Sequence, residues 1–73
     1  MIKLIFGHMY ANEANEEVKY VGIAEYHGVL YAIFGDPDHA GGWKEPLRMM
    51  PKSEFLNLFR HRGPDYGESH YDL

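Results

Sequence analysis

Cysteine is absent from the chain, and this absence excludes several classes of site at once. Without thiols there can be no disulfide framework, no Cys-ligated zinc and no thiol nucleophile. Threonine is also absent, and the two serines, Ser53 and Ser69, do not lie in the Gly-x-Ser-x-Gly turn that exposes a catalytic serine. The sequence therefore gives little support to nucleophilic catalysis.

Long apolar runs are missing too, which argues against a membrane-spanning segment. No stretch approaches the ~18 apolar residues that a membrane helix needs, and the opening run, Ile2–Phe6, is too short for the apolar part of a signal peptide. We therefore predict a cytoplasmic protein without a membrane partner. Its 73 residues suffice for one hydrophobic core. We predict a single domain over residues 1–73, with 63–73 as a tail.

Positive charge is scarce in the first half of the chain and concentrated in the second. The formal net charge is -4, and residues 1–40 are distinctly acidic. The sign reverses between Arg48 and Arg62 and reverses again in the tail. This division favours a protein partner over nucleic acid, whose phosphates an acidic chain repels. A nucleotide is excluded on other grounds, because Gly41 and Gly42 lead to Trp43 and not into a phosphate-binding helix.

The residues that are present favour β-structure over the first half of the chain. Alternation in Ile2–Phe6 predicts a first strand, and Ala11–Glu17 is too polar for more than a loop. Two segments rich in β-branched and aromatic residues, Val18–Tyr26 and Val29–Phe34, predict a hairpin that turns at His27 and Gly28. Gly22 predicts either a β-bulge or a close backbone approach, and both help a small sheet to curl toward a barrel.

The second half predicts a loop, a short strand and a helix. Turn-forming residues fill Asp36–Trp43, which we expect to be a long loop, and Leu47–Met50 can supply a last strand. Pro51 suits a first helical turn, and the apolar stripe ending at Phe59 has helical spacing. Gly63 and Pro64 would end the helix, placing Arg60, His61 and Arg62 in its last turn. The predicted class is α+β: a small antiparallel sheet, curled toward a barrel, with one short C-terminal helix.

The Asp36–Trp43 segment holds most of the candidate site residues. Asp36, Asp38 and His39 offer oxygen and imidazole ligands to a divalent ion. Asp-Pro-Asp is also a turn sequence whose side chains bond their own backbone, and it lacks the repeated ligand spacing of a calcium loop. Trp43 suits either an interface or the core. We predict no metal and no cofactor, and a binding surface made of Asp36, Asp38, His39, Trp43 and Arg48.

Residues 20–50 carry a resemblance to a protein family. Gly22, Ile23, Ala24, Tyr31, Gly35 and Asp36 precede the segment Trp43, Pro46, Leu47, Met49. This order resembles a family of small bacterial β-rich domains of unknown function, which share a Trp-x-x-Pro-Leu-x-Met segment after a strand hairpin. The chain departs from the family at Glu45, where the family has Arg, and at the helix that follows. The resemblance implies a compact, barrel-like β-fold and no particular chemistry.

Two functions remain after these exclusions. The first is a non-enzymatic protein-interaction module, a small acidic regulator or an inhibitor of a host protein of the kind that bacterial viruses encode. The second is a small metal-dependent enzyme or ligand-binding domain centred on the Asp36–Trp43 loop. We favour the first, with a second copy of the chain as a further candidate partner.

Overall fold

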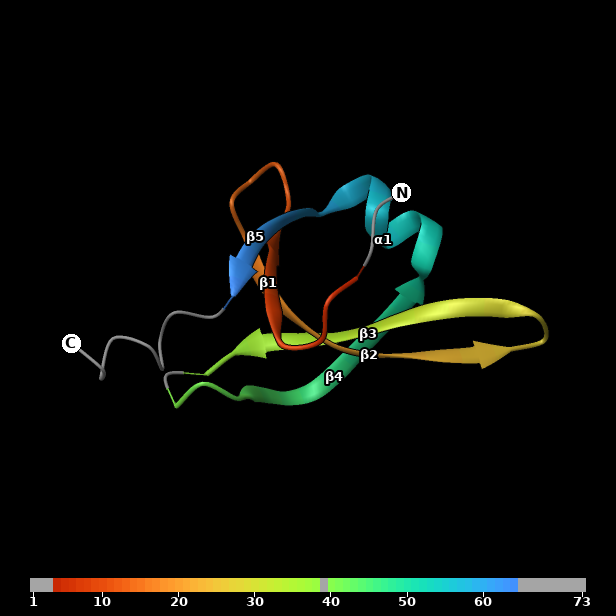
Figure 1. Cartoon of the computed structure of the whole chain (residues 1–73), viewed down its shortest axis with the longest axis horizontal. Coiled ribbons are helices and arrows are strands. Elements are labelled where there is room, and N and C mark those ends of the chain that lie inside the picture. The colour runs from red at the N-terminus through yellow and green to blue at the C-terminus, as the bar shows by residue number, and fades with distance from the viewer. Residues whose placement is uncertain (1–3, 39, 65–73) are drawn as a thin grey trace.

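The computed structural model describes residues 4–38 and 40–64, which form an antiparallel sheet with one short helix. The strands follow the spatial order β4-β3-β2-β1-β5, and all neighbours pair antiparallel (Figure 1). The α+β class is therefore confirmed. The elements are β1 (His8–Ala11), β2 (Glu17–Tyr26), β3 (Val29–Pro37), β4 (Trp43–Pro51), α1 (Lys52–Leu58) and β5 (Arg60–Pro64).

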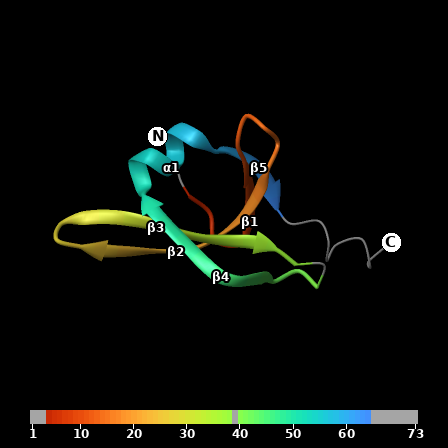
Figure 2. The same ribbon diagram turned by 180° about the vertical axis from the view of Figure 1, so that it is seen from behind.

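The β2–β3 hairpin agrees with the sequence prediction in its turn and in its bulge. His27 and Gly28 have φ values of 51° and 80°. Two successive residues with positive φ make a type I′ turn, whose twist matches that of the strands it joins. The register with β3 shifts between Tyr20 and Gly22, which is the β-bulge expected at this glycine. The distal part of this hairpin projects beyond the rest of the sheet (Figures 1 and 2).

The connection between β3 and β4 is shorter than the sequence indicated. Strand β3 continues to Pro37 and β4 begins at Trp43, so the predicted loop over Asp36–Trp43 is limited to residues 38–42. The fourth strand likewise covers all of Trp43–Pro51 and not only Leu47–Met50. Tertiary pairing with β3 accounts for the difference, since Asp36 lies opposite Lys44 and Pro37 opposite Trp43.

The predicted helix end is wrong, because α1 stops at Leu58 and the chain then becomes strand β5. Phe59 already has extended backbone angles, and residues 60–64 pair with β1. The Arg60 guanidinium still reaches the helix end, where its Nη1 donates to the carbonyl oxygens of Leu56 and Asn57 at 3.3 and 3.2 Å. A cation two residues beyond the end of α1 thus satisfies carbonyls of its last turn. Of the predicted tail, residues 65–73 lie outside the described residues.

The first strand also lies later than predicted. Residues 4–7 form no strand, and residues 2 and 3 of the predicted strand lie outside the described residues. The strand that enters the sheet is β1, His8–Ala11, which pairs with β2 on one side and β5 on the other. Three of its four residues, Met9 to Ala11, are buried. His8–Ala11 becomes the first strand because it is buried between two neighbouring strands, whereas the local alternation of apolar residues favoured an earlier segment.

The core lies between the sheet and α1. Phe55 of the helix is fully buried and meets Phe59 in a stacked arrangement, with 4.7 Å between ring centroids. The two phenylalanines therefore pack together. Burial, with Tyr10 adding to it, raises the pKa of Tyr20 above its ordinary value. The core consists of Tyr10, Val18, Tyr20, Ala32, Phe34, Phe55 and Phe59.

The sheet has two edges and does not close into a barrel. Its order begins at β4 and ends at β5, and these two strands are not paired with each other in the described structure. The register shift beside Gly22 is present, but the predicted barrel-like arrangement is not supported. Figures 1 and 2 show α1 and β5 on the same side of β2, β3 and β4. In the described part of the chain, no helix is long and apolar enough to span a membrane.

Candidate interaction surface

The sheet has an inner face, which carries the core, and an outer face on the opposite side. Successive residues of a strand point to opposite faces, so the burial of Ala32 and Phe34 assigns them to the inner face and Ile33 and Gly35 to the outer one. Cross-strand partners share a face. Met49 pairs with Ile33 and therefore belongs to the outer face.

An exposed apolar group occupies the outer face of β3 and β4. Leu47 is 39% exposed and Met49 is 62% exposed, two positions apart on the same strand. Phe6 is 63% exposed and meets the Trp43 ring edge to face, with 6.1 Å between centroids. Ile33 and Trp43 are partly exposed. We call the five residues Phe6, Ile33, Trp43, Leu47 and Met49 the outer patch.

Gly35 leaves room for the close approach of Leu47 and of the β4 backbone at Lys44. A Cβ placed on Gly35 would lie 2.9 Å from Leu47 Cδ2, 3.0 Å from the Lys44 carbonyl oxygen and 3.6 Å from Trp43 Cβ. Only a residue without a side chain leaves room for this approach. Gly35 itself is buried beneath them. The glycine in β3 thus leaves space on the outer face for Leu47, with Trp43 beside it.

The turn at residues 38–42 is held by hydrogen bonds that position Trp43. The Asp38 amide donates to the Gly42 carbonyl at 3.2 Å, and the Gly41 amide donates to the Asp38 carbonyl at 3.0 Å. The Nζ of Lys19, which is buried, donates to the carbonyl oxygen of Gly41. These hydrogen bonds connect the turn to β2 and so fix the position of Trp43, the first residue of β4.

The five predicted site residues do not form one surface. Asp36 and Arg48 are brought together, with 2.8 Å between Asp36 Oδ1 and Arg48 Nη2, and the guanidinium lies 5.0 Å from the centre of the Phe34 ring. Trp43 lies on the outer face, away from this pair. Asp38 belongs to the turn, where its Oδ1 accepts from the Ala40 amide at 3.4 Å. His39 lies outside the described residues.

Asp36 and Arg48 instead border a shallow hollow on the inner side of the sheet. The hollow has a volume of about 290 Å³ and includes Val18 and Phe59 of the core. Both partners of the ion pair are more than half exposed, at 66% and 51% of their side-chain surface. An ion pair this exposed contributes ~0–1 kcal/mol to stability. The ion pair lies at the edge of the core and is not part of the outer patch.

A candidate metal centre is not found around these acids. In residues 4–38 and 40–64, no three side chains of His, Asp or Glu gather closely enough to hold a metal ion. Asp36 Oδ1 is engaged by Arg48, and Asp38 Oδ1 by the backbone of its own turn. Only Asp38 has the turn role expected of Asp-Pro-Asp, because Asp36 and Pro37 belong to β3.

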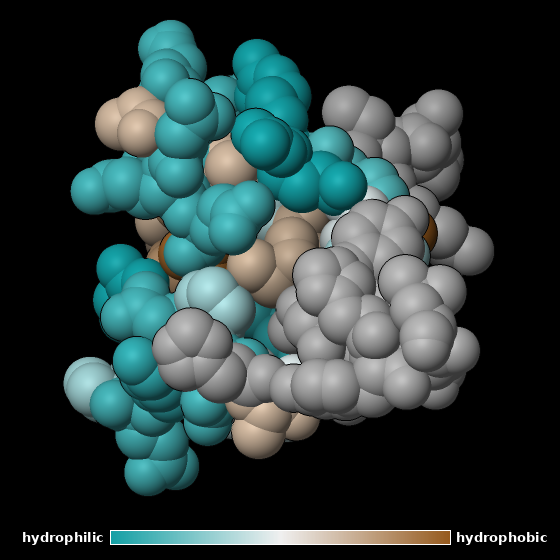
Figure 3. Space-filling view, turned by 90° about the vertical axis from the view of Figure 1, so that its left-hand side faces the viewer, coloured by the Kyte–Doolittle hydropathy of each residue, from teal (hydrophilic) through white to brown (hydrophobic). Residues whose placement is uncertain are grey.

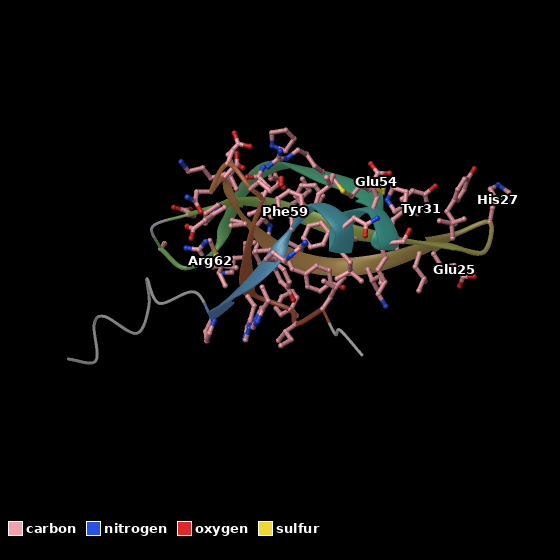
Figure 4. The ribbon with its side chains drawn as sticks, turned by 90° about the horizontal axis from the view of Figure 1, so that it is seen from above. Glu25, His27, Tyr31, Glu54, Phe59 and Arg62 are labelled. Atoms are coloured by element: carbon pink, nitrogen blue, oxygen red, sulfur yellow. The ribbon has the colours of Figure 1, made fainter. Side chains whose placement is uncertain are left out.

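The two ends of the molecule differ in character. At the hairpin end, Ile23, Tyr26, Val29 and Leu30 are exposed. Figure 4 shows Glu25 and His27 in this distal hairpin, far from Phe59 in the core. Figure 3 views the opposite end, where the described side chains are mainly hydrophilic. Most of the large exposed hydrophobic side chains therefore lie in the outer patch and along the hairpin, with Ile5 and Leu58 exposed elsewhere.

A larger hollow at the hydrophilic end has a structural explanation. It has a volume of about 450 Å³ and is lined by Asn12, Glu13 and the arginines of β5, among others. Arg60 is already bonded to the carbonyls at the end of α1, and Arg62 Nη1 donates to Asn15 Oδ1 at 3.3 Å. Arg60 therefore holds the end of α1, and Arg62 holds the loop between β1 and β2.

Sequence reasoning missed Phe6, Leu47 and Met49 as surface residues. Their apolar character pointed to the core, and only the position of α1 decides which face of the sheet is covered. Comparison with known proteins adds no relative: no family model, no curated protein and no solved structure matches the chain. The resemblance of residues 20–50 to the Trp-x-x-Pro-Leu-x-Met domains stays a prediction.

Proposed function

We propose that the protein is a non-enzymatic protein-interaction module that binds a partner through its outer patch. The observation that carries this proposal is the exposure of Phe6, Leu47 and Met49 beside Trp43. Single exposed apolar residues are ordinary in soluble proteins, but a contiguous group marks an interaction site. Trp and Met are also enriched at protein interfaces.

The patch is suited to contact through its face and not through the sheet edge. Strand β4 is an edge strand, and an exposed edge can pair with a strand of another chain. Pro46 and Pro51 lack the amide hydrogen that such pairing needs, and Lys44, Glu45 and Arg48 place charge along the edge. A partner therefore gains more by covering the apolar side chains than by extending the sheet.

The charge of the chain indicates the kind of partner. A net charge of -4 favours a partner that surrounds its apolar contact with basic residues, since complementary charge accelerates encounter. We propose a small acidic regulator or inhibitor acting in the cytoplasm on a basic site of a host protein, as bacterial viruses use them. The metal-dependent alternative gains no support, because Asp36 and Asp38 are engaged within the protein.

A capture experiment with two matched variants tests the proposal. Met49→Asp places a charge in the outer patch, whereas Leu58→Asp places the same charge on α1, at a residue that is 48% exposed. Immobilised wild type and Leu58→Asp should retain the same host protein from a lysate, and Met49→Asp should not. Sedimentation of the wild type alone separates a foreign partner from a second copy.

Two results would contradict the proposal. Retention of the host protein by Met49→Asp at the level of the wild type would remove the outer patch from the interface. Self-association of the wild type, abolished by Met49→Asp, would show that the patch is buried between copies of this chain.

A further inference from the structure

Two histidines meet on neighbouring strands, at a place that the proposed function does not use. His8 lies in β1 and His61 in β5, and His8 Nδ1 is 2.7 Å from His61 Nε2. The ring planes are nearly parallel, at 11°, with centroids 5.0 Å apart. The distance between ring centroids is longer than the distance between the two nitrogens by about the width of one imidazole ring, as expected when the nitrogens lie between the two ring centres. The two imidazoles therefore meet edge to edge, with one nitrogen of each directed at the other.

The strand register explains why residues so far apart in sequence meet. In the β1–β5 pair, Tyr10 lies opposite His61 and His8 opposite Pro64, with a register shift between Met9 and Tyr10. His8, Tyr10 and His61 therefore share a face. The Tyr10 ring, which is buried, lies 5.2 Å from the His61 ring and supports it from the core side. His61 is exposed, so the pair opens to solvent.

The chemistry of facing imidazoles suits a metal ion as well as a proton. A neutral imidazole offers one N–H donor and one lone pair, so a single proton joins the two rings at this distance. Imidazole is the commonest protein ligand for zinc, copper and nickel, with metal–nitrogen bonds of ~2.0–2.1 Å. Two nitrogens bound to one ion at a tetrahedral or octahedral angle lie roughly 3 Å apart. A small opening of this pair, with a rotation of both rings that turns their lone pairs toward a common point, would therefore admit an ion.

We propose that His8 and His61 form a two-imidazole site for a divalent transition-metal ion such as Zn²⁺. On binding, the ring that donates the shared proton would change tautomer and carry that proton on its other nitrogen, and each ring would bind the ion through the nitrogen that now faces its neighbour. No third His, Asp or Glu gathers with them in the described parts of the chain, so these two imidazoles are the ligands on which the proposal rests. The bound ion would join β5, an edge strand, to β1.

Zinc titration of the full chain tests this site. Since an ion that binds only the folded state stabilises it by mass action, the unfolding midpoint should rise by on the order of 5 °C when zinc reaches about ten times its dissociation constant. Magnesium at the same concentration should have no such effect, because it prefers oxygen ligands. His8→Gln and His61→Gln should each abolish the zinc effect.

His27→Asn provides the matched control. It also removes one imidazole, and Asn tolerates the positive φ of 51° at this turn position. The zinc-induced rise should persist in this variant. A rise that persists in His8→Gln or in His61→Gln would overturn the proposal, since the ion would then be held elsewhere. Absence of any rise in the wild type would show a hydrogen-bonded pair only.

A second measurement on the wild type does not depend on the folding of any variant. Substoichiometric Cu²⁺ is paramagnetic and broadens the resonances of the imidazoles that bind it. We expect the His8 and His61 side-chain signals to broaden first and together, before that of His27. Broadening of one of the two without the other would contradict a shared site.

Discussion

The inner and outer faces of β3 and β4 are built from alternating residues of the same strands, yet they meet different surroundings. On the inner face, Ala32 and Phe34 are buried under α1 and β1. On the outer face, Ile33, Leu47 and Met49 are as apolar but remain partly or largely exposed. Since the residue types are alike, hydrophobicity alone does not separate a core from a binding surface. The position of one seven-residue helix, α1, determines which face becomes the core.

The inner face should be the more sensitive of the two to truncation. Phe55→Ala removes a fully buried ring that contacts Tyr10, Tyr20 and Phe34. The expected loss is ~3–5 kcal/mol, which can unfold so small a domain. Urea unfolding followed by circular dichroism measures it. Leu58→Ala, at the exposed side of the same helix, is the control and should change stability by ~0.5 kcal/mol or less.

Gly35 lies on the outer face of β3 beneath Leu47, and a side chain there should disturb the outer face alone. Gly35→Ala brings a Cβ within 3.0 Å of the Lys44 carbonyl oxygen and 2.9 Å of Leu47 Cδ2. We expect a loss of ~1–3 kcal/mol from this overpacking, with displacement of Leu47 and Trp43. Tryptophan fluorescence of the folded variant should shift. An unchanged spectrum and unfolding midpoint would show that Leu47 and Trp43 do not rest on Gly35.

Substitution in the turn of the projecting hairpin should lower stability less than substitution on either face of the sheet. Gly28 has a φ of 80°, which a β-branched residue adopts only with strain. Gly28→Val should therefore lower stability by ~1–2 kcal/mol. Gly22→Ala is the comparison, since a Cβ at Gly22 meets nothing within 4 Å. Equal effects of the two substitutions in thermal unfolding would contradict the type I′ turn.

The smallest expected effect is a pH dependence that comes from the inner face. The raised pKa of Tyr20 means that the folded state holds its phenolic proton more tightly than the unfolded state does. The stabilisation is complete below pH ~10, the ordinary pKa, and is lost as the pH rises through the folded-state value. Urea midpoints measured from pH 8 to 11 should fall less steeply in Tyr20→Phe than in the wild type.

Local chemistry made some of this fold predictable. The His27–Gly28 turn, the bulge beside Gly22 and the packing of Phe55 on Phe59 all follow from residue types a few positions apart. Strand β5 could not be predicted from residue types a few positions apart. Arg60, His61 and Arg62 suit a helix end, and only their pairing with β1, far away in sequence, makes them a strand.

The candidate surface was predictable to a smaller extent. Trp43 was singled out by its residue type and lies in the outer patch, whereas Asp36 and Arg48 pair with each other on the inner side. Leu47 and Met49 carried no signal of exposure, because the same alternation would fit a buried face. Which face is covered depends on where α1 packs, and that is a property of the whole chain.

The most direct test of the outer patch compares affinity and stability in the same samples. With the captured partner purified, dissociation constants and unfolding midpoints are measured for the wild type, Met49→Asp and Leu58→Asp. We predict that Met49→Asp weakens binding about tenfold or more, equivalent to ~1.4 kcal/mol. Leu58→Asp should bind as the wild type does, and all three midpoints should agree within a few degrees. Equal affinity of Met49→Asp and the wild type would contradict the assignment of the outer patch as the binding surface.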